Sequence, residues 1–240
     1  MRRAVRGGIA TVGFMAVVTV SPARAEAESE GTASREVVPE LNAYIKLSDQ
    51  ARLFLLADVS RTSPDDATNG EIGIHFDYSV PPILRNELRD ADWARDRYLW
   101  FRVGYRRIAS IDGRADGTQE NRVLLEGTAR FKLPLDVWLA NRIRVELRDA
   151  NDKRSNRYRY RLAAEKEFAT ESGSPFVPYA QAEWFYDTRF SAWSRQRYQT
   201  GVEVALNKTW RIEPYYAYDK DTEPSRASVN RLGLVLKYYR

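Results

Sequence analysis

The feature that most constrains the fold of this chain is an alternation of apolar and polar residues, repeated in segments of about ten residues from residue 38 onward. In segment 137–149, Val145 and Leu147 fall on one face of an extended chain, and Arg144 and Arg148 fall on the other. Side chains of a strand alternate between its two faces, whereas a helix would scatter these charges around its axis. The pattern therefore predicts strands with one apolar and one ionic face.

Eleven segments follow this pattern. They are residues 40–47, 51–61, 71–78, 98–108, 122–132, 137–149, 155–167, 177–187, 196–205, 209–218 and 228–239. Tight turns are expected at 48–50, 133–136 and 206–208, and longer polar connections rich in Asp, Pro, Gly or Ser at 62–69, 112–119 and 219–225. Only 85–97 could be helical, and it could equally be a charged loop. We therefore expect an all-β chain without a second domain.

A soluble barrel or sandwich would also alternate, with its apolar faces turned into a core, so the membrane alternative needs its own support. Strands of this length match a tilted transmembrane strand. Many aromatic residues fall near strand ends, as expected for the girdles at the two lipid interfaces. These are Tyr98, Trp100, Trp138, Trp184, Tyr186, Trp210, Tyr238 and Tyr239. We therefore expect an antiparallel, up-and-down transmembrane β-barrel.

The first 25 residues have the features of an export signal. Arg2, Arg3 and Arg6 precede an apolar run at 9–20, which is shorter than the roughly 20 residues of a spanning helix. Ala-Arg-Ala at 23–25 fits a cleavage site, and this favours a signal peptide over a membrane anchor or a twin-arginine signal. The expected organisation is a signal peptide at 1–25, a flexible mature N-terminus at 26–37 and an outer-membrane barrel at 38–240.

Composition excludes several function classes once the signal is removed. The chain has 38 basic residues, four of them in the first 25, against 33 acidic residues, so the mature chain is close to neutral. Its charge therefore gives no reason to expect a nucleic-acid partner. With no cysteine and one histidine, the chain offers no disulfide and no metal site, and it lacks the glycine motifs of nucleotide binding. We expect no cofactor.

The last segment carries a polar-x-Gly-x-x-apolar-x-aromatic pattern in which Gly233, Leu236 and Tyr238 hold the defining positions. It is similar to the terminal-strand signal by which the barrel-assembly machinery recognises outer-membrane clients. This chain departs from many barrels because two residues follow the aromatic one. The expected partners are therefore the assembly machinery during biogenesis and outer-membrane lipid afterwards.

Strand parity sets the expected number of strands. Bacterial barrels have even counts, with both termini and the short turns on the periplasmic side. The three tight turns fall on the side of the C-terminus, although the long connection at 79–97 falls there too. Eleven strands would leave the N-terminus on the other side. We therefore expect twelve strands, with one missed near the N-terminus, or ten if 40–47 does not span.

Three stretches resemble an uncharacterised family of bacterial outer-membrane barrels that is catalogued only as a domain of unknown function. They are Asn-Arg-Ile-Arg-Val-Glu-Leu-Arg at 141–148, Arg-Tyr-Arg-Tyr-Arg at 157–161 and Pro-Tyr-Ala-Gln-Ala-Glu-Trp-Phe-Tyr-Asp at 178–187. The closing strand looks like the same family, and the resemblance covers the mature chain, most clearly residues 97–240. It implies a barrel in the outer membrane and no established activity.

The ionic face of the strands is expected to line the barrel lumen. The candidate lumen residues are Arg102, Arg106, Arg122, Glu126, Arg130, Arg142, Arg144, Glu146, Arg148, Arg157, Arg159, Arg161, Glu165, Glu183, Glu203, Arg211 and Glu213. Paired across strands, they would fill a narrow interior and fix the register, which is the structural role we favour. Left unpaired, the arginines would line a narrow porin for anionic solutes such as acidic oligosaccharides.

A lipid hydrolase is the disfavoured alternative. Barrels that resemble outer-membrane phospholipase or lipid A deacylase carry a His-x-Ser pair, in which the imidazole activates the hydroxyl. Here Asp77 stands two residues after the single histidine, His75, and Ser79 lies four residues on, roughly 13 Å along an extended strand. We therefore expect a polar lumen residue at His75 and no enzyme activity.

Overall fold

The computed structural model describes residues 34–64, 66–80, 98–113, 117–169, 175–222 and 228–240. The expected signal peptide, residues 26–33 and the segment 85–97 lie outside these described residues. Eleven strands run through the described part. They are Ser34–Lys46 (β1), Ala51–Ser63 (β2), Ala67–Ser79 (β3), Leu99–Ser110 (β4), Gln119–Lys132 (β5), Val137–Ala150 (β6), Lys153–Lys166 (β7), Phe176–Asp187 (β8), Ala192–Ala205 (β9), Trp210–Asp221 (β10) and Val229–Tyr239 (β11). A single 3-10 turn, Pro134–Asp136 (η1), lies between β5 and β6.

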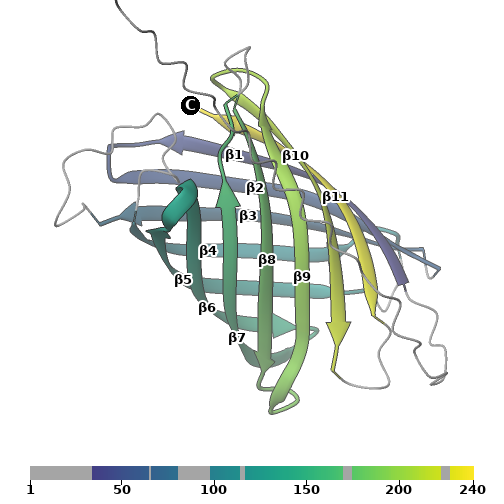
Figure 1. The fold of residues 1–240 in the computed structure, drawn as a ribbon. Coiled ribbons are helices and arrows are strands. Elements are labelled where there is room, and N and C mark those ends of the chain that lie inside the picture. Colours follow the sequence, from purple (N-terminus) through teal and green to yellow (C-terminus); the bar gives the residue numbers. More distant parts are fainter. Residues whose placement is uncertain (1–33, 65, 81–97, 114–116, 170–174, 223–227) are drawn as a thin grey trace, which may run out of the picture. The chain divides into compact units, whose positions relative to one another are not determined.

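The strands close into one barrel in chain order, so the predicted all-β barrel is confirmed. Each strand pairs antiparallel with the next, and the barrel closes where β1 pairs parallel with β11, from Ser34 beside Val229 to Tyr44 beside Tyr239. Figure 1 shows β1 in purple next to β11 in yellow, with the two strands running in the same direction. Helices in the described ranges are all too short or too polar to cross a membrane.

The described part of the structure has eleven strands, as many as the alternating segments in the sequence. The expectation of an even number, twelve or ten, is therefore wrong by one strand. In an up-and-down barrel with an odd number of strands, the first and last strands must run in the same direction, which is the pairing observed. Within the described residues no twelfth strand is present, and β1 is a full-length strand, so the ten-strand alternative does not hold either. Because β1 begins at Ser34, the barrel also starts inside the segment expected to be a flexible N-terminus.

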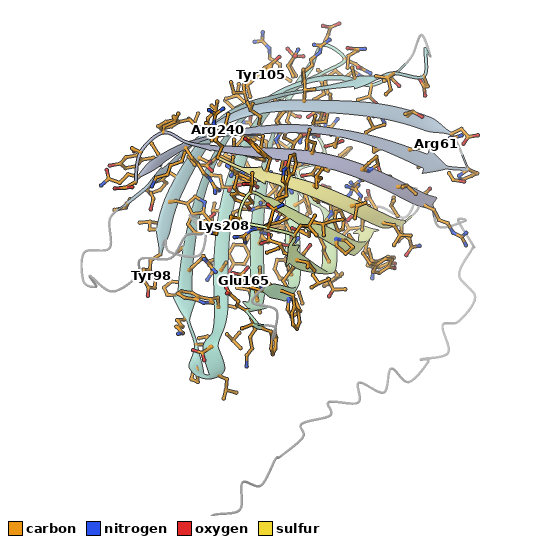
Figure 2. All side chains as sticks on the ribbon, turned by 90° about the horizontal axis from the view of Figure 1, so that it is seen from above. Arg61, Tyr98, Tyr105, Glu165, Lys208 and Arg240 are labelled. Carbon is orange, nitrogen blue, oxygen red and sulfur yellow. The ribbon has the colours of Figure 1, made fainter. Side chains whose placement is uncertain are left out.

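The two ends of the barrel are distinguished here by the residues they carry, as the Arg240 end and the Ser34 end. The turns at 48–50, 133–136 and 206–208 and the connection after Ser79 all lie at the Arg240 end, as expected. Figure 2 shows Arg61 at the Ser34 end and Tyr98 and Arg240 toward the opposite end.

The Ser34 end differs from the expectation of long connections. Asn151 and Asp152 form a two-residue turn between β6 and β7, with φ of 49° and 62°. Asn and Asp tolerate this left-handed conformation, which a two-residue hairpin turn requires at both positions. Most of the connection predicted at 62–69 is strand, because β2 continues to Ser63 and β3 begins at Ala67.

Apolar and charged side chains are distributed inside out compared with a soluble protein. Large apolar residues in mid-strand lie on the outer surface, where Ile72 and Ile143 are each 63% exposed. Charged residues fill the interior, where Arg144 is 4% and Glu146 0% exposed. A soluble barrel would turn its apolar faces inward, so this arrangement contradicts that alternative.

Aromatic side chains flank the apolar surface at both ends. Trp210 packs on Tyr238 at the Arg240 end, with ring centroids 4.9 Å apart, and Tyr186 packs on Trp193 at the Ser34 end. Trp100, by contrast, faces the interior, where it lines the cavity described below. Tyr239 lines the same cavity. The expectation that all the aromatic residues near strand ends belong to the girdles is therefore wrong for these two.

Candidate functional site

The strand register brings arginines directly opposite one another inside the barrel. Arg142 on β6 faces Arg161 on β7, and Arg144 faces Arg159. Like charges at facing positions repel, so such a register is stable only where carboxylates are inserted between the arginines. The interior supplies them from the same strands and from β8.

Three glutamates hold the centre of this arginine cluster. Glu126 accepts hydrogen bonds from Arg144, with Nε at 2.7 Å. Glu146 accepts from Arg159 at 2.7 Å, and Glu183 accepts from Arg159 at 2.8 Å and also from Arg142. The three carboxylates are almost completely buried. Because a buried charge is stable only when paired and hydrogen-bonded, these contacts tie β5 to β8 at one register.

Asp187, at the last position of β8, joins the network near the Ser34 end. It accepts hydrogen bonds from Arg148 at 2.8 Å, Arg157 at 2.9 Å and Arg189 at 3.1 Å, and it is 0% exposed. Arg148 also donates two hydrogen bonds to Glu120, at 2.6 and 2.7 Å. A single carboxylate thus gathers three guanidinium groups.

A second charged cluster lies on β2, β3 and β4. Asp77 accepts from Arg52 at 2.7 Å and from Arg102 at 2.6 and 2.9 Å. Arg106, four residues after Arg102 on the same face of β4, donates to Glu71 at 2.6 Å and to Nε2 of His75 at 2.9 Å. These contacts place the single histidine within the ionic lining.

A third cluster lies near the closure of the barrel. Lys237 on β11 bonds Glu203 at 2.6 Å and also bonds Glu213, while Arg211 donates to Glu203 at 2.6 Å. Nearer the Ser34 end, Arg197 pairs with Asp219 through contacts of 2.6 and 2.7 Å. Ion pairs therefore continue around the barrel as far as β11.

An aromatic ladder crosses the closure on the inner face. It consists of Tyr239, Tyr44, Phe54 and His75, on β11, β1, β2 and β3, with successive ring centroids 4.8, 4.7 and 4.7 Å apart and nearly parallel planes. Guanidinium groups cover the ladder, with Arg52 4.3 Å from the centre of the Tyr44 ring. Stacking and cation–π contacts thus join the first strand to the last.

A narrow cavity of about 550 Å³ remains among these groups. It extends from residues near the Arg240 end, such as Trp100 and Glu165, to residues near the Ser34 end, such as Glu36 and Arg195. Its lining is mostly charged or polar. The cavity is lined by the predicted lumen residues, so it is the candidate functional site.

The structure places every predicted lumen residue on the inner face. Those that line the cavity are Arg102, Arg106, Arg122, Glu126, Arg130, Arg142, Arg144, Arg157, Arg159, Arg161, Glu165, Glu183, Glu203 and Glu213. The other three, Glu146, Arg148 and Arg211, bond inward-facing partners. Most of the arginines are paired, but Arg161 forms no hydrogen bond or ion pair with the residues that the structure describes. Of the predicted assembly signal, Gly233 faces the interior, whereas Leu236 and Tyr238 lie on the outer face of β11.

Several interior residues are absent from that prediction. They are Arg52, Glu71, Asp77, Glu120, Asp187, Arg197, Asp219 and Lys237. The alternation itself could have found Asp187, since it continues the inward series of Glu183 and Phe185 on β8. It could equally have found Glu120 on β5, two residues before Arg122.

The histidine relevant to a hydrolase is engaged elsewhere. Nδ1 of His75 lies 3.2 Å from the carbonyl oxygen of Phe54, and Nε2 accepts from Arg106. Ser79 is fully buried, and its hydroxyl has no partner among the described atoms. The imidazole therefore makes no contact that would activate this hydroxyl. In the same part of the chain, no group of three or more His, Asp or Glu side chains is placed to hold a metal ion.

Comparisons with known proteins give a family and distant fold relatives. The family model described as "Protein of unknown function (DUF2490)" matches residues 92–230. The crystal structure of the β-domain of the Bordetella autotransporter Brka is 17% identical and covers 73% of this chain and 79% of that chain, with a TM-score of 0.44. A likeness at this level carries no inference about function. No curated protein matches the chain.

Proposed function

The chain belongs to the DUF2490 family of proteins of unknown function, and from that premise we propose that it is an outer-membrane β-barrel with a structural ionic interior. The proposal includes export by a cleaved signal peptide, insertion by the barrel-assembly machinery and contact with outer-membrane lipid. The sequence features support export and insertion, and the inside-out surface supports contact with lipid.

The observation that carries the membrane location is the outer surface. On β3 and β4, the outward side chains form an unbroken apolar band: Ile72, Ile74, Phe76, Tyr78, Leu99, Phe101, Val103 and Tyr105, each 37–63% exposed. The band continues on β11 at Leu232 and Leu234. In water such a surface would drive aggregation, whereas in a bilayer it faces hydrocarbon between two aromatic girdles.

The pairing of the interior charges supports the structural role. Basic and acidic groups are present in nearly equal numbers, and most guanidinium groups donate to a carboxylate at hydrogen-bond distance. An arginine committed in this way is not available to attract a passing anion. The network instead fixes which residues face each other across neighbouring strands.

Cell fractionation tests the location. A tagged full-length protein expressed in a Gram-negative host is expected in the outer-membrane fraction, to resist extraction by alkaline carbonate, and to migrate differently on a gel before and after boiling. Recovery in the soluble periplasmic fraction, with no change of migration on boiling, would contradict the proposal.

A narrow porin for anionic solutes is the second candidate, and the cavity that reaches residues near both ends favours it. Planar-bilayer recordings separate the two roles. The structural role predicts no discrete channels from protein whose folding has been verified by its heat-modifiable migration. Reproducible anion-selective channels would replace the structural role with the pore.

A lipid hydrolase remains the disfavoured alternative, because His75 bonds Phe54 and Arg106 and has no contact with Ser79 among the described residues. Purified protein is expected to release no fatty acid from phospholipid vesicles. Hydrolysis that disappears in His75→Ala would establish the enzyme instead.

A further inference from the structure

Three inward-facing side chains occupy neighbouring positions in one row across the barrel. Thr128 on β5 is the register partner of Arg142 on β6, and Arg142 is the register partner of Arg161 on β7. All three line the cavity. They form one continuous patch of hydrogen-bond donors, defined here as the Arg161 patch.

The donors of the Arg161 patch are incompletely satisfied. Nε of Arg142 and the hydroxyl of Thr128 are buried and have no hydrogen-bond partner within the described chain. Arg142 is 7% and Thr128 1% exposed. The guanidinium of Arg161 has no bonded partner among the same residues. Buried donors without acceptors are rare and costly, so the two beside the half-buried Arg161 indicate a missing acceptor.

The nearby carboxylates are already engaged. Glu126 accepts two contacts from Arg144, and Glu183 accepts from both Arg159 and Arg142. The remaining acid on this side of the cavity, Glu165, is bonded to Arg130. Arg161 is therefore the arginine of the patch that no neighbouring acid bonds among the described residues, and it lines the cavity.

The row next to the patch, toward the Arg240 end, supplies room and further polar groups. Ala140 and Ala163 are register partners there, and Gln181 and Gln199 continue the row on β8 and β9. All four line the cavity. The two alanines leave space beside Arg161, and the two amides offer donors and acceptors suited to hydroxyl groups.

We propose that the Arg161 patch binds the carboxylate of a small, hydroxyl-rich acid such as a sugar acid. A planar carboxylate accepts two parallel hydrogen bonds from a guanidinium, and here Arg161 supplies the fork while Thr128 and Nε of Arg142 complete the acceptor's shell. The hydroxyl groups of the ligand lie toward Gln181 and Gln199. This binding site goes beyond the proposed structural role, and it requires no conduction through the barrel.

Binding is tested on purified, folded protein in detergent by calorimetry and by tryptophan fluorescence, since Trp100 lines the same cavity. The probes are glucuronate, the neutral match glucose and inorganic phosphate. We expect saturable binding of glucuronate, no binding of glucose and weaker binding of phosphate. Arg161→Gln should weaken glucuronate binding about tenfold or more, and Arg161→Lys less so.

The matched control is Arg107→Gln, which removes an arginine that bonds Asn121 and Gln119 on the outer face of the barrel. It should bind glucuronate as the wild type does. The proposal is overturned if folded wild-type protein does not bind glucuronate, if glucose or phosphate binds as tightly, or if Arg161→Gln leaves the affinity unchanged. Membrane fractionation of the same variants is read separately, so a failure of the site is distinguishable from a failure of the membrane location.

Discussion

Two parts of the inner surface are built differently. The inner face of β4 to β9, here the arginine wall, is held by carboxylates placed between facing arginines, as where Asp187 gathers three guanidinium groups. The closure between β11 and β1 is instead crossed by the aromatic ladder, with guanidinium groups above it. Neighbours in the arginine wall follow one another in the chain, whereas the strands of the closure are the two ends of the barrel sequence.

This difference shows how an odd-stranded barrel can close. No hairpin connects β1 to β11, so chain connectivity contributes nothing to their register. Tyr44 stacks on both Phe54 and Tyr239, and thus links the partner on each side of β1. Arg231 on β11 adds an ion pair to Glu36 on β1 at 2.6 Å. Side-chain contacts take over the role that turns play elsewhere in the sheet.

The largest effect is expected in the arginine wall. Asp187→Ala removes the shared partner of three guanidinium groups, of which that of Arg148 is buried, and removing one member of a buried ion pair costs about 3–5 kcal/mol. Urea unfolding in detergent, followed by tryptophan fluorescence, should show at least this loss or a failure to fold. The matched control, Asp149→Ala, removes an exposed pair with Arg154 at 3.9 Å and should cost about 1 kcal/mol or less. Equal losses for both would contradict a stabilising network.

A smaller effect is expected at the closure. Tyr44→Leu keeps an apolar side chain but removes two stacked ring contacts, each worth about 0.5–1.5 kcal/mol. Tyr216→Leu is the control, because that ring lies on the outer face, where its hydroxyl donates to Asn230. If the ladder fastens the closure, the first variant should unfold at clearly lower urea concentration than the second. A greater loss of stability in Tyr216→Leu would show that the ladder does not fasten the closure.

The inner and outer faces should also differ in their tolerance of added volume. A Cβ at Gly104 would lie 2.1 Å from the His75 ring, so Gly104→Ala must displace that ring and should cost about 1–3 kcal/mol. On the outer face, a Cβ at Gly127 would be 3.5 Å from Phe101, an ordinary contact. Gly127→Ala should therefore leave the free energy of unfolding nearly unchanged. Equal losses of unfolding free energy in the two variants would show that the His75 ring does not depend on the absence of a side chain at Gly104.

The smallest effect is expected at the turn between β5 and β6. Lys132 bonds Asp136 at 2.8 Å, and this hydrogen bond lowers the pKa of Asp136 below its ordinary value. Stabilisation from this group is present above the pKa of an unfolded aspartate and is lost as the pH falls through the lower folded value. The urea midpoints of wild type and Asp136→Asn should therefore differ slightly at neutral pH and converge in acid. A difference between the two midpoints that grows in acid would contradict a stabilising pair of Lys132 and Asp136.

The sequence predicts most of the fold because the alternation of apolar and polar residues shows which side chains share a face of each strand. Arg142, Arg144 and Arg148 could be assigned to the inner face of β6 from their spacing alone. The partners of these arginines could not be predicted, since they lie on other strands and depend on register. Arg148, for example, bonds Glu120 and Asp187.

Two errors have identifiable causes. The twelve-strand expectation followed from a rule about even counts, and no local pattern in the sequence reports whether the last pairing is parallel or antiparallel. The short turn at 151–152 was missed because Asn151-Asp152 lacks glycine, although both residues adopt positive φ. The unpaired state of Arg161 was equally hidden, because pairing depends on neighbours brought together only in the closed barrel.

The interior and its cavity depend on the closure of the barrel between β1 and β11. A pair of introduced cysteines tests this closure directly. The chain has no cysteine, and Val37 and Leu232 are register partners in the closure with outward, exposed side chains. The double variant Val37→Cys and Leu232→Cys should form an intramolecular disulfide on mild oxidation, whereas Val37→Cys with Leu236→Cys, four residues out of register, should not. A disulfide only in the second pair, or in neither, would contradict the parallel closure.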